Sequence, residues 1–248
     1  MRIITLVLLF VVTLIGSLIA TMPLGFVLDR TPAKQLGVDW AQVSGTVFSG
    51  QIFGMTAGAQ QIGDMTLKLS PMALVSGRVR YRIAWNGVPG SGSADLAVGR
   101  DALAVSDLNA VIDIEPLVGL DNEVRRIGGS ASIRSGEVQF ARNACVQASG
   151  QIATNVLARA AASYGQSGGE LSGVLACDGP MLSIPLSGSS DDGDLFDAEF
   201  RIGLAEASSF ATRVETSNPE LSTLLTLRGF ERENGILTYN RTVRIGGI

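Results

Sequence analysis

The stretch RVRYRIAWNG, residues 78–87, contains the pattern on which the predicted fold rests. Apolar residues alternate with arginines, which places the two kinds of side chain on opposite faces of a strand. One face would carry Val79, Tyr81, Ile83 and Trp85, and the other Arg78, Arg80 and Arg82. Asn86-Gly87 is a signal for a tight hairpin turn. A strand with one buried and one solvated face is typical of an antiparallel sheet.

The same two-residue period recurs along the chain, for example in LNAVIDI (108–114) and FDAEFRIGL (196–204). Pairs that favour turns separate such runs at intervals of roughly 8–14 residues. They include Ser135-Gly136, Asp178-Gly179, Asp192-Gly193 and Asn234-Gly235. We therefore predict an all-β protein, built as a large curved antiparallel sheet or as a folded-over, sandwich-like sheet.

Ser-Gly pairs punctuate these runs, beginning with VSGTVFSGQ at residues 43–51 and continuing in phrases that start at 75, 148 and 171. Glycine supplies a positive φ or a bulge, so the pairs are expected at strand boundaries. Their spacing is too loose for a strict repeat.

Helices are predicted at few places. Residues 218–229 begin with Asn218-Pro219 and end at Gly229, in agreement with helix start and stop rules. Residues 154–165 form a weaker candidate, and the prolines at 71 and 116 suggest single helical turns. No low-complexity linker interrupts residues 29–248, so they are predicted to form one β-rich domain.

The composition excludes several function classes. The 248 residues contain no histidine, which removes Ser-His-Asp and Cys-His nucleophile systems and nearly all catalytic zinc sites. The chain has 19 Lys and Arg against 23 Asp and Glu, and its only lysines are Lys34 and Lys68. A nucleic-acid partner would require a basic stripe, and none is visible.

The segment from Ile3 to Leu28 is uncharged and long enough to cross a bilayer as a helix. A cleaved signal peptide is the alternative, but Leu18 occupies a position where its cleavage site needs a small residue. We predict an N-terminal transmembrane anchor at residues 1–28. Because Arg2 and the amine precede the span, residues 29–248 are predicted to lie in the periplasm, held at a bacterial inner membrane.

The two cysteines, Cys145 and Cys177, both follow the span. In an oxidising compartment they are predicted to form one disulfide. A thiolate metal site would need further soft ligands, and their spacing does not fit a CxxC redox pair.

Other constellations have simpler interpretations. The acidic run at 191–199 does not match a calcium loop and is interpreted as a solvated hairpin, and GVPGSGSAD (87–95) is interpreted as a hairpin loop. Neither lysine has Ser-x-x-Lys spacing, and the acids Asp113 and Glu115 share one face of a solvated strand. We therefore predict no catalytic residue, cofactor or metal.

The face formed by Arg78, Arg80 and Arg82 is the most unusual charge feature. It is interpreted as a solvated sheet face, and alternatively as a contact for an acidic partner or a lipid headgroup.

A set of phrases in order along nearly the whole chain resembles the type II secretion system protein N family, also called general secretion pathway protein N. After the apolar segment come VSGTVFSGQ, LSPMALVSGRVRYRI, GGSASI, ACVQASGQI, LACDGPMLSIPLSG and LLTLRGFERENGILTY. The aromatic usual in the first motif is Phe48, whereas Leu67 stands near a place where the family often has tryptophan. The resemblance implies an accessory inner-membrane component of the machine that exports folded proteins, without catalytic residues.

The leading hypothesis is a non-enzymatic secretion component that meets other subunits through sheet edges or a concave face. The alternative is an anchored lipid-binding or lipid-transfer protein, whose sheet would form an apolar trough that includes Ile83 and Phe200. An anchored hydrolase is disfavoured because histidine is absent.

Overall fold

The computed structural model describes residues 7, 10, 13–14, 17, 21–35, 37–75, 79–99, 101–118, 122–163, 168–204 and 207–243. It divides into two compact units, Met1–Val88 and Pro89–Ile248. Most of the predicted anchor, residues 1–28, lies outside the described residues. Among the residues that are described, no helix has the length and apolarity needed to cross a membrane.

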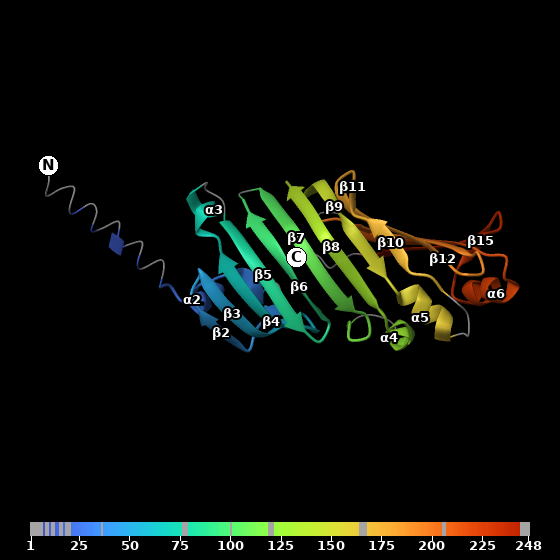
Figure 1. Cartoon of the computed structure of the whole chain (residues 1–248), viewed down its shortest axis with the longest axis horizontal. Helices are drawn as coiled ribbons and strands as arrows, with labels where there is room; N and C mark the ends of the chain where they lie inside the picture. Colours follow the sequence, from blue (N-terminus) through green and yellow to red (C-terminus); the bar gives the residue numbers. More distant parts are fainter. Residues whose placement is uncertain are drawn as a thin grey trace. The chain divides into compact units, whose positions relative to one another are not determined.

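The first unit is an antiparallel sheet with short helical segments (Figure 1). Its elements are α2 (Leu24–Leu28), a 3-10 turn η1 (Pro32–Lys34), β1 (Val38–Asp39), β2 (Gln42–Gly45), β3 (Ser49–Ala57), β4 (Gln60–Leu69), α3 (Pro71–Val75) and β5 (Val79–Gly87). The order is β1-β3-β4-β5, and β2 pairs with the first half of β3.

The register confirms the alternation predicted for β5. Leu67 lies opposite Ile83 and Met65 opposite Trp85, whereas Lys68 lies opposite Arg82 on the other face. Tyr81, Ile83 and Trp85 are half-buried. Burial raises the pKa of the Tyr81 hydroxyl, as expected for an ionisable group on the apolar face.

The VSGTVFSGQ stretch forms the β2–β3 hairpin and receives helix α2. Pro23 forms an isolated antiparallel bridge with Thr46, and the Val47 N–H donates to the Met22 carbonyl at 3.1 Å. Leu24 is only 5% exposed, and a Cβ at Gly50 would overlap its Cδ2 atom. Gly50, in the second Ser-Gly pair, has no side chain and so leaves room for Leu24 of α2 to pack against the sheet.

The second unit is a longer antiparallel sheet with three short helices in the described residues. Its strand order is β6-β7-β8-β9-β10-β12-β13-β14-β16-β15, with β11 beside β12. The elements are β6 (Gly90–Val98), β7 (Ala102–Asp113), α4 (Asn122–Ile127), β8 (Ser130–Ala141), β9 (Ala144–Thr154), α5 (Val156–Ser163), β10 (Leu171–Val174), β11 (Ala176–Asp178), β12 (Met181–Ser189), β13 (Leu195–Ile202), β14 (Ser208–Glu215), α6 (Pro219–Leu227), β15 (Glu231–Glu233) and β16 (Ile236–Val243).

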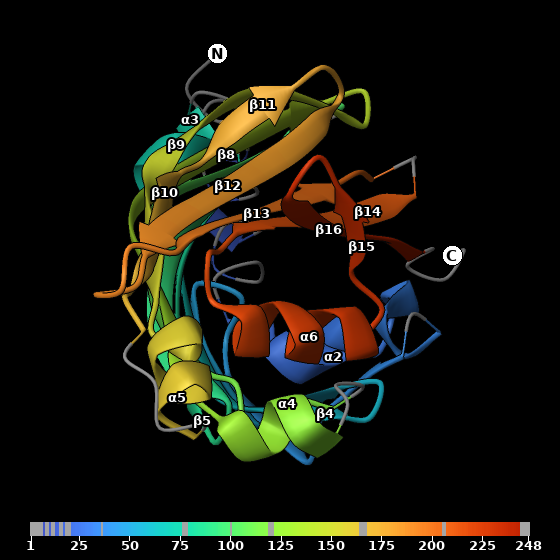
Figure 2. The same ribbon diagram turned by 90° about the vertical axis from the view of Figure 1, so that its right-hand side faces the viewer.

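Figure 2 shows that this sheet bends between β10 and β14 and that α6 lies on the inner side of the bend. The bend agrees with the curved antiparallel sheet, the first of the two forms predicted from the sequence. On the apolar face Val214 lies opposite Leu237, and among the described residues these are the large side chains that are less than 2% exposed. Aromatic rings extend this face, with Phe200 4.5 Å from Phe210 between ring centroids.

The helix predicted at residues 218–229 is confirmed as α6. The Asn218 side chain accepts hydrogen bonds from the Glu220 and Leu221 N–H groups, at 2.9 and 3.3 Å. Helix α5 lies within the predicted range 154–165, and α3 begins at Pro71, where a helical turn was predicted. Helix α4 was not predicted, because its six residues NEVRRI are too few to show an apolar period.

Two turn predictions are wrong. The turn predicted at Asn86-Gly87 lies two residues later, at Val88-Pro89, because β5 continues through Gly87. A Cβ at Gly87 would overlap the Ile62 carbonyl oxygen of β4, so this glycine belongs to a close strand pair. Ser135-Gly136 is a bulge within β8, with Ser135 at φ 51° and a register shift against β9. By contrast, Asn234-Gly235 forms the predicted hairpin between β15 and β16.

The Gly87→Ala variant tests the close β4–β5 approach. The added methyl group meets backbone atoms that cannot rotate away, so we expect a loss of about 1–3 kcal/mol in the free energy of unfolding, measured by urea denaturation. Gly99→Ala is the control, because its nearest neighbour would be the Ala102 carbonyl oxygen at 3.6 Å. Equal stabilities of the two variants would contradict this account.

Candidate interaction surfaces

The described residues contain no group of three or more His, Cys, Asp or Glu side chains placed to hold a metal ion. The acidic run at 191–199 forms the turn between β12 and β13 and the start of β13. Within this turn the Asp194 N–H donates to Ser190 Oγ at 3.1 Å, and Ser190 Oγ donates to Asp194 Oδ2 at 3.3 Å. Asp194 is 6% exposed, so the turn buries this carboxylate among its own polar groups.

The other candidate chemical groups are separate and exposed. Lys34 forms an ion pair with Asp29 at 3.5 Å, and Lys68 is exposed on β4. Asp113 ends β7, and Glu115 is exposed two residues later. Residues 90–95 of the glycine-rich stretch lie within β6. None of these positions combines burial, a base and a nucleophile.

The predicted arginine face is present in part. Arg80 and Arg82 are exposed on the same face of β5, and Arg78 lies outside the described residues. Lys68 lies directly opposite Arg82 in β4, so the structure adds a third cation from another strand. We call Lys68, Arg80 and Arg82 the basic face. Lys68 alternates out of MTLKLS, but its place beside Arg82 depends on strand register, which the sequence does not give.

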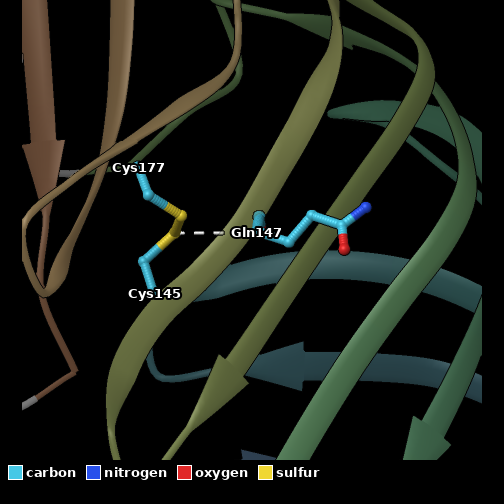
Figure 3. The surroundings of a disulfide bond; sticks show 3 residues. All are labelled: Cys145, Gln147 and Cys177. Carbon is cyan, nitrogen blue, oxygen red and sulfur yellow. Dashed lines mark hydrogen bonds between the residues drawn. A yellow bond between two sulfur atoms is a disulfide. The ribbon is translucent and has the colours of Figure 1, made fainter.

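The predicted disulfide between Cys145 and Cys177 is present and joins β9 to β11 (Figure 3). Leu175 separates β10 from β11, is 3% exposed and donates its N–H to the Gly150 carbonyl at 3.0 Å. The Cys145 N–H also donates to the Pro180 carbonyl at 2.9 Å. The disulfide therefore holds β11 against the sheet just beyond the point where the strand is interrupted.

The polar face of β12–β14 forms an open groove of ≈ 590 Å³, whose lining includes Pro185, Glu199 and Arg213. Glu199 accepts from Arg201 at 3.0 Å and from Ser183 Oγ at 2.8 Å. These hydrogen bonds, with Arg201 contributing most, lower the pKa of the Glu199 carboxyl. Arg201 also meets Asp178 at 3.2 Å, and its carboxylate partners raise its own pKa. The Glu199 carboxylate in the groove is thus held by side chains that lie beside the groove.

An apolar cavity of ≈ 330 Å³ lies between α5 and α6. Its lining includes Leu157, Ala160, Phe196, Leu221 and Leu224. The side of α6 that carries Leu221 and Leu224 therefore faces this cavity.

The described residues thus define an antiparallel all-β protein with few short helices. The chain belongs to the type II secretion system protein N family, whose model matches residues 36–240. This match confirms the family predicted from the ordered motifs. No curated protein and no solved structure matches the chain. Family membership makes the protein a component of type II secretion.

The double variant Cys145→Ser/Cys177→Ser should be less stable by about 3–4 kcal/mol, because the bond closes a long loop of the unfolded chain. The two cysteines are 32 positions apart. Urea denaturation of the full chain, with and without reductant, measures the effect. Reductant should destabilise the unsubstituted chain and leave the double variant unchanged; a reductant-insensitive unsubstituted chain would contradict the prediction.

Glu199 should contribute to the pH dependence of stability. Its pKa in the folded chain is lower than the ordinary value of 4.5, so its contribution is present above pH 4.5 and is lost as the pH falls through the folded-state value. The stability difference between the unsubstituted chain and Glu199→Gln should therefore shrink below pH 4.5. Urea midpoints measured across this range provide the test, and a difference that stays constant would refute it.

Proposed function

We propose that this protein is an accessory, non-catalytic inner-membrane component of the type II secretion machinery that works through contacts in the periplasm. The family match over residues 36–240 carries the proposal. The absence of histidine and the open polar surfaces support a role in binding rather than in catalysis.

The proposed location rests on the uncharged segment from Ile3 to Leu28, which serves as a single-pass anchor. Arg2 and the amine stay on the cytoplasmic side, and residues 29–248 follow on the periplasmic side. A disulfide between Cys145 and Cys177 suits that oxidising compartment.

Two surfaces are proposed for contacts with other secretion subunits. The basic face presents three cations from neighbouring strands and therefore suits an acidic partner. The second surface is the β16 edge, because among the described residues Tyr239–Val243 pair with β14 only, while β15 covers Ile236–Thr238. A strand with a partly open edge accepts an extended segment by main-chain hydrogen bonds.

A periplasmic lipid-binding role is the second candidate, favoured by the apolar cavity between α5 and α6. Phe200, at 40% exposure on the apolar face of β13, also belongs to the surface expected for such a role. Leu224→Asp should then lower the phospholipid that copurifies with the protein. Leu227→Asp on the same helix is the control, since Leu227 is 82% exposed and does not line the cavity. Equal lipid content in both would remove this candidate.

Deletion of the gene should lower the amount of exported protein in the medium and raise it in the periplasm. Complementation with Arg80→Glu/Arg82→Glu should restore export poorly, because the substitutions reverse the charge of the basic face. Arg80→Lys/Arg82→Lys keeps the charge and should restore export. The measurement is the ratio of exported protein in medium and periplasm at matched expression.

Unchanged export after deletion would overturn the secretion role itself. Full restoration by the charge-reversed variant would leave the secretion role standing and remove the basic face as a contact surface.

A further inference from the structure

The segment after the predicted span is fixed to the sheet. Helix α2 is held by the Pro23–Thr46 bridge, by the hydrogen bond from Val47 to Met22 and by Leu24, which packs over Gly50. We call these contacts the clamp. Because these contacts involve backbone atoms as well as a side chain, they hold α2 and the β2–β3 hairpin together as one rigid unit (Figure 1).

Two cation–aromatic pairs lie in the sequence between the two halves of the clamp. The Arg30 guanidinium carbon lies 4.2 Å from the centroid of the Phe26 ring, and Lys34 Nζ lies 5.0 Å from that of Trp40. Phe26 is 47% exposed although it is a large apolar side chain. We call Phe26, Arg30, Lys34 and Trp40 the interface belt.

The length of the apolar segment places the belt. A bilayer core of about 30 Å takes about 20 helical residues at about 1.5 Å each. If the span starts at Ile3, those residues extend to about position 22, so α2 lies within about 10 Å of the end of the core, in the headgroup layer. The Lys34 ammonium pairs with Asp29, the C-cap residue of α2, at 3.5 Å and therefore lies beside this helix. Tryptophan and other aromatic side chains favour this layer, and basic side chains there meet lipid phosphates.

We propose that the interface belt is a membrane-docking site that binds the phospholipid headgroup layer around the anchor. The Arg30 guanidinium donates to lipid phosphate oxygens, and so does the Lys34 ammonium, which has N–H groups to spare beyond its ion pair with Asp29. The Phe26 and Trp40 rings lie among the headgroups. The Arg30 guanidinium can do both at once, since its face stacks on an aromatic ring while its N–H groups point outward in its plane.

Through the clamp, docking of α2 at the membrane also positions the sheet of the first unit. Because α2 is fixed to the β2–β3 hairpin, the sheet is held at the membrane surface in one orientation instead of moving on a flexible tether. This inference rests on the proposed anchor at residues 3–28 and adds a site to it.

The test uses the full chain in phospholipid nanodiscs that contain brominated lipids, which quench nearby indoles. The chain has two tryptophans, so Trp85→Phe leaves Trp40 as the single reporter. Trp40 fluorescence should fall by about twofold or more with bromines high on the acyl chain, and less with bromines near the bilayer centre.

Two variants in the same background test the two parts of the inference. Gly50→Leu displaces Leu24 and should weaken the quenching, whereas Gly25→Ala, whose added Cβ would lie 3.8 Å from the Val43 Cβ, should leave it unchanged. Phe26→Ser/Arg30→Gln changes exposed side chains only and should also weaken the quenching. It keeps the docking site testable if Gly50→Leu does not fold.

Carbonate extraction of native membranes separates this inference from the anchor. A chain that is released by carbonate refutes the anchor and with it the docking site. A chain that stays in the membrane while Trp40 is quenched no more than by unbrominated lipid leaves the anchor standing and overturns the docking site. Quenching that is the same in Phe26→Ser/Arg30→Gln also overturns it.

Discussion

Backbone hydrogen bonds between antiparallel strands are the interaction on which the rest of this structure depends. Among the described residues, the large side chains that are less than 2% exposed are Leu237 and Val214. With so few fully buried side chains, each strand is held by its neighbours along the ladder and by short helices such as α6. The disulfide acts beside the interruption between β10 and β11. This construction leaves much polar strand surface available for contacts.

The same pairing of strands produces the two surface features to which we assign a role, the basic face and the clamp. A basic face arises because β4 and β5 bring Lys68 and Arg82 side by side, and the clamp arises because Gly50 admits Leu24. Membership of the type II secretion system protein N family makes the protein a component of type II secretion. We propose that the basic face and the clamp serve its contacts with other components.

Local patterns predicted much of the fold, and they failed where distant backbone segments meet. The alternation in RVRYRIAW and the cap at Asn218 are decided by neighbouring residues, so β5 and α6 were predicted correctly. Asn86-Gly87 has the sequence of a turn, but Gly87 lies in β5, where the absence of a Cβ lets the backbone pack closely against Ile62, twenty-five positions away. The partners of Lys68 and Leu24 likewise depend on register and docking. The family was predictable because the order of its motifs survives in the sequence.

Hydrogen exchange at the Val43–Gln51 hairpin, in the full chain held in a lipid bilayer, tests the central claim most directly. The claim is that the ladder and the clamp make the sheet and α2 one piece. The account predicts that the Val47 amide, which donates to the Met22 carbonyl, exchanges as slowly as amides within β3 and β4. Exchange of Val47 at the rate of an exposed turn, with β3 and β4 still protected, would contradict it.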